Sequence, residues 1–219
     1  MNNSLSIPSL VIPQEYKLVL ASISKFRRSV IDSLHIPYIQ DRAGINEKRI
    51  RDRDPRKLTM KLAEAKMNAV CRRKSLTNAL IITADQVAVK DGVIREKPST
   101  DAQCYEYLQS YVHSDVSFYS AVCVYNTETQ KRFVDCDVST IEFGDIPQEV
   151  QDHLVALGDV KYSCGGITVE NPEFQSCIKS MDCYDRIMGI PLYMVQKGID
   201  AVCECCVCKT HSKQMHAII

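Results

Sequence analysis

The sequence predicts an α/β fold in which helices flank a twisted mixed sheet, with a cleft between two lobes. Short apolar runs have the length of buried strands, apolar residues recur at helical spacing, and two alternating segments are joined by a short turn. The chain has 219 residues, of which 45% are hydrophobic and 25% charged, a globular balance. We expect one domain over residues 16–200, after a lead-in at 1–15 and before a Cys-rich tail at 201–219.

The first predicted elements are a strand and a helix. Tyr16–Ala21 is a short apolar run with the length of a buried strand. Ser24 can then cap a helix that carries Val30 and Ile31 on its apolar side. The segment Gln40–Asp54 is dense in charge, so we expect a loop rather than a part of the core.

A longer helix is predicted after this loop. Asp54 can accept hydrogen bonds as the N-cap, and Pro55 suits the first helical position. The predicted buried face carries Leu58, Leu62, Ala65 and Ala69. Lys66 lies on the same apolar side, where an unpaired ammonium is costly. We expect Lys66 either to extend to solvent or to join a charged site.

The central part of the chain predicts a second strand and a third helix. Ala79–Ala84 is apolar and is expected to end at Asp85, at an edge of the sheet, before a small hairpin that turns at residues 91–92. Thr100 and Gln103 have the spacing of a capping box.

The remaining elements are a hairpin and two helices. Val116–Tyr125 and Arg132–Phe143 alternate in polarity and predict a long antiparallel hairpin. A helix is expected after Pro147, and another near Pro191. The buried side of the former should carry Val150, Leu154 and Leu157.

Charge and cysteine usage limit the possible partners and compartments. The 27 basic side chains equal the 27 acidic ones, whereas proteins that bind nucleic acid or anionic membrane usually have a basic excess. No run approaches the roughly 20 apolar residues of a membrane span, and no secretory signal is evident. Eleven cysteines without an export signal indicate reduced thiols. We expect a cytoplasmic protein without nucleic-acid or membrane partners; the oligomeric state, including a homodimer, stays open.

Two polar groups of residues follow the predicted strands. The segment Ser22–Arg28 places two hydroxyls and three cations at a strand-to-helix turn, where helix N–H groups and paired arginines favour phosphate. A solvated basic helix face is the alternative. Asp85 can hold Mg²⁺ or accept a proton from water, and the hairpin brings Lys97 back towards it. A surface Asp and Lys is the alternative there, and Glu47 taken alone is solvated.

Taken together, these segments resemble the Maf family, which is related in fold to the inosine-triphosphate pyrophosphatases. The similarity runs from about residue 16 to residue 199. The matching segments are LVLASISKFRR (18–28), INEKR (45–49), DPRKLTMKLAEAKMNAV (54–70), IITADQVAVKDGVIREKP (81–98), CGGITVEN (164–171) and MGIPL (188–192). Because they match in one order, the combination is more specific than any single segment.

The resemblance implies hydrolysis of a nucleoside triphosphate to a monophosphate and pyrophosphate. It implies that Asp85 is the catalytic base and that Glu47 and Asp85 hold a divalent metal, Mg²⁺, Mn²⁺ or Co²⁺. The implied phosphate and metal site consists of Ser22, Arg27, Arg28, Glu47, Lys66 and Lys97. Water attack at the α-phosphorus needs such a base, and departing pyrophosphate needs such cations.

Three positions divide the family by substrate. One branch has S-x-S-P-R-R with D-T and is associated with dTTP and UTP; the other has S-x-S-P-W-R-R with D-Q and is associated with 7-methyl-GTP. Phe26, Gln86 and Glu170 place this chain with the second branch. An aromatic face attracts a cationic base, and a carboxylate can accept from guanine N1–H and N2–H₂. The chain departs from the pattern at Lys25, where the family has Pro, and at Phe26, where it has Trp.

Four other interpretations stay open. Phe26 can pack against its own helix and Glu170 can be a loop charge. A non-catalytic nucleotide-binding regulator is possible for this family, although the retained Asp85 and Glu47 favour an enzyme. Cys203–Cys208 with His211 offers zinc ligands, but it lacks the paired spacing of common zinc sites. Cys164 has no Cys-His signature and is a weak candidate for a nucleophile.

Overall fold

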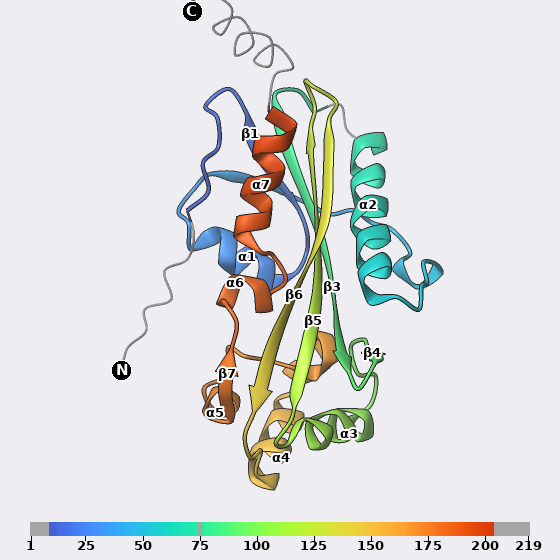
Figure 1. The fold of residues 1–219 in the computed structure, drawn as a ribbon, viewed down its shortest axis with the longest axis vertical. Helices are drawn as coiled ribbons and strands as arrows, with labels where there is room; N and C mark the ends of the chain where they lie inside the picture. Colours follow the sequence, from blue (N-terminus) through green and yellow to red (C-terminus); the bar gives the residue numbers. More distant parts are fainter. Residues whose placement is uncertain (1–8, 74–75, 204–219) are drawn as a thin grey trace, which may run out of the picture.

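The computed structural model describes residues 9–73 and 76–203, which form one sheet with helices on both faces (Figure 1). The strands are β1 Lys17–Ala21, β2 Tyr38–Asp41, β3 Ala79–Lys90, β4 Val93–Arg95, β5 Asp115–Asn126, β6 Arg132–Phe143 and β7 Ile178–Met181. The helices are α1 Lys25–Asp32, α2 Pro55–Arg73, α3 Asp101–Tyr111, α4 Gln148–Leu157, α5 Pro172–Ser176, α6 Tyr184–Ile187 and α7 Leu192–Cys203. Three short 3₁₀ turns span Glu47–Arg49, Asp159–Tyr162 and Cys164–Gly166.

The sheet has seven strands in the order β2-β1-β3-β5-β6-β7, and β4 pairs with β3. β1 is parallel to both of its neighbours, whereas β3, β5, β6 and β7 are antiparallel to one another. The predicted mixed α/β fold is confirmed, and so is the long hairpin, in which β5 and β6 pair along eleven residues from Asp115↔Glu142 to Tyr125↔Arg132.

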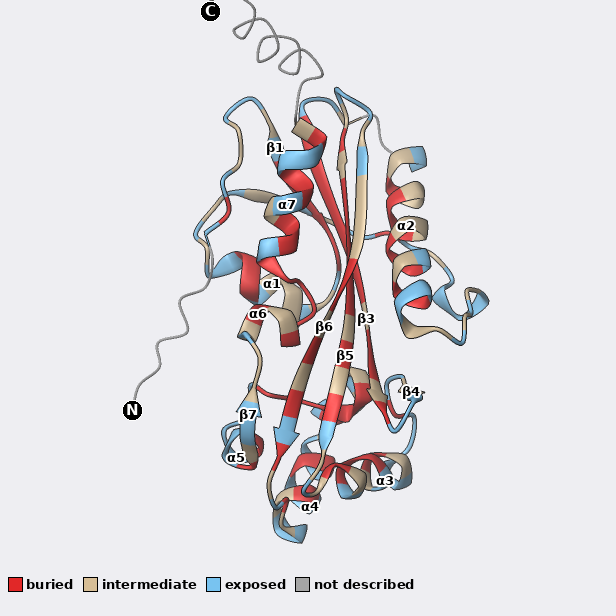
Figure 2. Cartoon of the chain, viewed as in Figure 1, coloured by how far each residue is buried: buried red, intermediate tan, exposed pale blue. Residues whose placement is uncertain are grey.

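Helix α2 covers one face of the sheet, and α1 and α7 lie on the other (Figure 1). Alternation along β3 explains this, because Leu80 and Ile82 join the core beneath α1 and α7 whereas Ile81 packs with Met67 of α2. Figure 2 shows the buried side of α2 turned towards the sheet. At the far end of the hairpin, α3 and α4 complete the core, where Tyr111, Phe143 and Phe174 stack.

The predicted helix starts are found in the structure. Ser24 Oγ accepts from Arg27 N–H, Asp54 Oδ1 accepts from Arg56 N–H at 2.9 Å, and Thr100 Oγ1 accepts from Gln103 N–H at 3.2 Å. Each side chain satisfies an N–H group that has no partner within its helix. Within the described residues, no helix has both the length and the apolarity needed to span a bilayer.

Other details of the prediction were wrong. The buried face of α2 carries Leu58, Leu62 and Lys66, whereas Ala65 and Ala69 are only half-buried because they lie at the edge of that face. Leu157 at the end of α4 is 51% exposed, since Leu154 and Val155 fill the core side of its last turn. Part of the charged loop forms β2, an edge strand whose side chains are half-buried or exposed. Residues 1–8 and 204–219, including most of the Cys-rich tail, lie outside the described residues.

Candidate active site

The site lies at an interruption in the pairing along one edge of β3. β1 pairs with β3 as far as Leu20↔Ile82, and β4 begins to pair at Ala88↔Arg95. Asp85 lies between these two pairings, while its other edge is paired with Ala121 of β5. The sequence predicted a strand that ends at Asp85, but β3 runs on to residue 90. The carboxylate is reachable because the neighbouring strand β1 ends.

The thiol of Cys164 occupies part of this interruption. Its Sγ accepts from the backbone N–H of Ala88 at 2.9 Å and lies 3.5 Å from the carbonyl oxygen of Gln86. Burial raises the pKa of Cys164 to about 12, against the opposing effect of the Ala88 N–H and of nearby Arg27. The group is therefore a neutral thiol at pH 7 that satisfies the strand edge, which argues against a nucleophile.

Charged side chains surround the buried Asp85: Lys66 is also buried, whereas the Glu47 side chain is 55% exposed. Lys66 Nζ of α2 lies 2.6 Å from Asp85 Oδ1 and 3.1 Å from Glu47 Oε1. It also lies 3.4 Å from the carbonyl oxygen of Ala84. Of the two outcomes expected for Lys66, the structure shows the charged site. Burial raises the pKa of Asp85, and Lys66 and Arg27 act in the opposite direction. Asp85 is therefore a desolvated carboxylate held among cations.

Arg27 enters the same site from α1. Its Nε donates to the carbonyl oxygen of Gly189 at 2.8 Å, which fixes the guanidinium plane. Burial lowers the pKa of Arg27, and the nearby carboxylates of Asp85 and Glu47 oppose this effect. Ser22 Oγ accepts from the N–H of Ser24, the N-cap of α1. The start of α1 thus brings a fixed guanidinium and a helix N-terminus to the acidic pair.

These groups line one large cleft of about 1770 Å³. The predicted residues that line it are Ser22, Phe26, Arg27, Glu47, Lys66, Asp85, Gln86, Lys97 and Glu170. Arg28 is not among the lining residues, and its Nε is buried without a hydrogen-bond partner. Consecutive helical residues point about 100° apart, so Arg27 and its neighbour face different surroundings. The structure thus brings the predicted phosphate-site and specificity residues together around one cleft and leaves Arg28 outside it.

Gln86 points to the opposite face of β3 from Asp85, as strand alternation requires. Its Nε2 donates to Ser120 Oγ at 2.9 Å and to the carbonyl oxygen of Ile187 at 2.9 Å. Gly189 follows this loop with a φ of +79°, and a Cβ at that position would lie 3.0 Å from Gln86 Oε1. A side chain at this position would crowd Gln86 and be strained at the positive φ, and Gln86 holds the loop that in turn holds Arg27.

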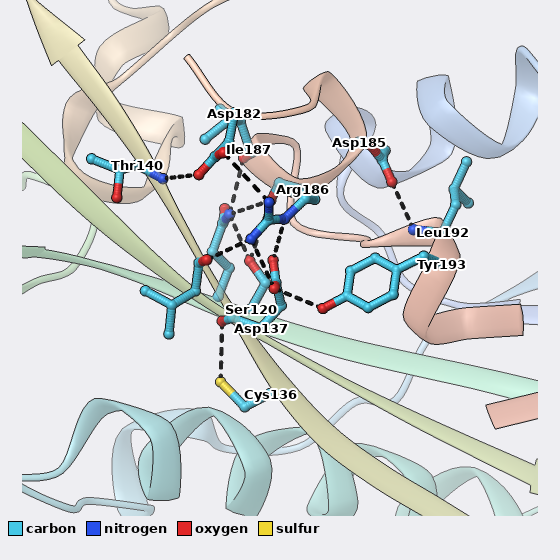
Figure 3. Close-up of polar contacts among 12 residues, drawn as sticks. Ser120, Cys136, Asp137, Thr140, Asp182, Asp185, Arg186, Ile187, Leu192 and Tyr193 are labelled. Atoms are coloured by element: carbon cyan, nitrogen blue, oxygen red, sulfur yellow. Dashed lines mark hydrogen bonds and ion pairs between the residues drawn. The ribbon is translucent and has the colours of Figure 1, made fainter. Parts of the chain in front are cut away.

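An ion-pair network between β6 and α6 supports this loop (Figure 3). Arg186 donates to both carboxylate oxygens of Asp137, at 2.7 and 2.9 Å, and to the carbonyl oxygen of Val138 at 2.6 Å. Tyr193 donates to Asp137 at 2.8 Å, and Asp182 Oδ1 lies 3.4 Å from Arg186 Nη1. Sequence reasoning did not select Asp137 or Arg186, because they lie 49 residues apart without a shared motif.

Asp85 and Glu47 are donors of the kind that a divalent cation takes together with phosphate oxygens. Both carboxylates contact the same Lys66 ammonium, at 2.6 and 3.1 Å, so the two groups lie close together. In residues 9–73 and 76–203 no group of three acidic, His or Cys side chains is placed to hold a metal. Mg²⁺ is commonly bound by one or two carboxylates together with substrate phosphates and water, which matches this donor set.

Comparison with known proteins identifies the family of this chain. The model of the Maf-like protein family matches residues 17–202. A Dictyostelium discoideum protein named 7-methyl-GTP pyrophosphatase is 37% identical over 193 residues, 84% of this chain and 96% of its own length. A protein of the same name from Idiomarina loihiensis is 38% identical over 149 residues, 68% of this chain and 75% of its own. One from Methylobacillus flagellatus is 30% identical, with 84% and 98% covered. The chain therefore belongs to the Maf family.

Proposed function

We propose that this protein hydrolyses 7-methyl-GTP to 7-methyl-GMP and pyrophosphate, with a divalent metal. The observation that carries the reaction type is the buried Asp85 carboxylate with Lys66, Glu47 and Arg27 around it, at the wall of a cleft of about 1770 Å³. The names of the relatives in three organisms support the same reaction and the same nucleotide.

In the proposed reaction, a water oxygen attacks the α-phosphorus and the bond to the β-phosphate oxygen breaks. Asp85 accepts the proton of the attacking water, and its desolvated carboxylate suits this task because burial favours the protonated form. Pyrophosphate leaves with the bonding electron pair. Arg27 and Lys97 bind its oxygens, and the N-terminus of α1 contributes N–H groups.

Lys66 has a different role in this proposal. Its ammonium is hydrogen-bonded to Asp85 and lies within reach of Glu47, so it holds the two carboxylates at one place before the nucleotide binds. Glu47 and Asp85 would hold the divalent cation. Such a cation polarises the phosphate oxygens and neutralises charge on the leaving group.

The preference for 7-methylguanine rests on the other wall of the cleft. Phe26 and Glu170 both line it, so an aromatic face and a carboxylate acceptor are available to one base. Gln86 contributes indirectly, because its amide N–H₂ group donates to Ser120 and to the carbonyl of Ile187. Its effect on specificity is proposed to act through the position of the loop at residues 187–189.

A pyrimidine nucleotide such as dTTP or UTP is the second candidate substrate within the same family. It shares the phosphates, so it uses the groups around Asp85 equally well. It lacks the adjacent N1–H and N2–H₂ donors of guanine, and it leaves the partly buried Glu170 carboxylate without a donor pair.

Pyrophosphate release from a panel of canonical and 7-methylated nucleotides, with and without a chelator, tests the proposal. We expect the largest kcat/KM on 7-methyl-GTP and no turnover with the chelator. In ¹⁸O-labelled water, the label should appear in 7-methyl-GMP and not in pyrophosphate, because water attacks the α-phosphorus. Release of orthophosphate and 7-methyl-GDP, or label in pyrophosphate, would contradict the assigned reaction.

A further inference from the structure

A cation of the protein itself already lies at the base-binding wall of the cleft. Lys25 Nζ lies 5.1 Å from the centroid of the Phe26 ring. The same atom lies 3.9 Å from Glu170 Oε1 and 3.4 Å from Asp159 Oδ1. Lys25, Phe26 and Glu170 all line the cleft. The ammonium therefore contacts both the aromatic ring and the carboxylate that the proposed function assigns to a positively charged base.

These contacts are of a kind that a ligand can replace. The side chain of Lys25 is 51% exposed and that of Glu170 is 35% exposed, whereas Lys66 in the same cleft is 10% exposed. Ion pairs in contact with water contribute little free energy, since solvent screens them and ordering a long side chain costs entropy. Four rotatable bonds also let the ammonium leave while its backbone stays in the first turn of α1.

On the basis of the proposed function, we propose that Lys25 is an internal competitor of the nucleotide's cationic base. In the free protein its ammonium occupies the Phe26 ring and Glu170, and the 7-methylguanine ring takes that place when the nucleotide binds. The displaced ammonium stays tethered within a side-chain length of the bound ring. A cationic ring is repelled by this neighbouring charge, whereas neutral guanine is not.

A phosphate-binding role for Lys25 makes a different prediction. An ammonium near the N-terminus of α1 that contacted phosphate would strengthen the binding of every nucleotide alike. Its loss would weaken 7-methyl-GMP and GMP by the same factor. The ratio of the two dissociation constants separates the two roles, because both ligands carry the same sugar and phosphate.

The test uses Lys25→Met, which keeps the length of the stem and removes the charge, and Lys25→Arg, which keeps the charge. Isothermal titration calorimetry without metal measures the dissociation constants of GMP and 7-methyl-GMP. We expect the ratio Kd(GMP)/Kd(7-methyl-GMP) to rise about three- to tenfold in the Met variant, a size typical of one exposed cation contact. The Arg variant should keep the wild-type ratio.

A ratio that stays the same or falls in Lys25→Met would overturn the inference, and so would the absence of any preference in both proteins. The proposed reaction fails separately. Monophosphates are not turned over, so a protein that binds 7-methyl-GMP and releases no pyrophosphate from 7-methyl-GTP contradicts the reaction and leaves the role of Lys25 intact.

Discussion

The two walls of the cleft are built in different ways. At the phosphate wall, Lys66 and Asp85 are about nine-tenths buried and are joined at 2.6 Å, and both project from long elements of the fold. The base wall is the part of the cleft at Phe26 and Glu170. There Lys25, on the first turn of α1, is 51% exposed, and Glu170, in a loop, is 35% exposed; the two charged groups lie 3.9 Å apart. Under the proposed function, the chemical step would depend on fixed geometry, whereas the choice of base would depend on contacts that solvent and ligand can replace.

This difference predicts unequal effects of mutation. A buried charge that loses its partner affects every substrate and also the stability of the fold. A half-exposed group that contacts only the base affects one substrate more than another. Variants at the two walls therefore separate the reaction from the specificity.

The largest effect is expected from Asp85→Asn at the phosphate wall. The substitution keeps the size of the side chain but removes the proposed proton acceptor, so kcat should fall about 10²–10⁴-fold on every nucleotide. Steady-state pyrophosphate release measures this loss. Asp115→Asn, at an exposed carboxylate at the start of β5 and away from the cleft, is the matched control and should keep full activity. Near-normal turnover in a folded Asp85→Asn variant would remove this carboxylate from the mechanism.

The next largest effect is expected from Lys66→Met. The variant leaves the Asp85 carboxylate buried without its ammonium, so the free energy of unfolding should fall by about 3 kcal/mol. Urea unfolding measures this change. Lys61→Met on the same helix is the control, because Lys61 is 53% exposed and its ion pair with Asp52 is screened by water. Equal losses of unfolding free energy in the two variants would show that the buried ion pair contributes no more to stability than the exposed one.

A smaller effect on rate is expected from Arg186→Met, at the network behind the loop. Asp137 loses its two charged hydrogen bonds, and the loop that positions Gly189 and Arg27 loosens. We expect kcat on all nucleotides to fall about tenfold, which corresponds to about 1.4 kcal/mol. The assay is run well below the melting temperature of the variant. Reduced stability with an unchanged kcat would mean that the network supports only the fold.

The smallest effect is expected from Glu170→Gln at the base wall. The amide adds an N–H₂ donor that faces the donors of guanine. The activation free energy for kcat/KM on 7-methyl-GTP should therefore rise by about 1 kcal/mol more than that on UTP. The low value follows from the exposure of Glu170, which lets water replace the lost contact.

Phe26→Ala, at the same wall, should lower kcat/KM on 7-methyl-GTP more than on GTP, because stacking on the charged ring is the extra contribution. Equal losses on both substrates would make these positions structural.

The sequence predicted which residues line the cleft better than it predicted their arrangement. Asp85, Lys66 and Glu47 were selected from motifs, and strand and helix periodicity placed Lys66 on a buried face. The pairing of Lys66 with Asp85 joins residues 19 positions apart on different elements, which no local pattern specifies. The access to Asp85 depends on where β1 ends relative to β3, a property of the sheet rather than of either strand.

The least predictable part was the support of the site by distant residues. Arg186 and Asp137 meet only because β6 and α6 pack together, and each residue is unremarkable within its own segment. The side chain of Arg28 was also misplaced, since two consecutive arginines in a helix cannot share one direction. Specific side-chain pairs across elements require the tertiary fold before they can be assigned.

The separation of the two walls is tested most directly by kcat/KM for wild type, Asp85→Asn and Glu170→Gln on 7-methyl-GTP and UTP. We predict that Asp85→Asn lowers both values by the same factor, about 10²–10⁴, and leaves their ratio unchanged. Glu170→Gln should change the ratio and leave UTP turnover close to wild type. A change of ratio in Asp85→Asn, or equal losses on both substrates in Glu170→Gln, would contradict the assignment of chemistry to one wall and base choice to the other.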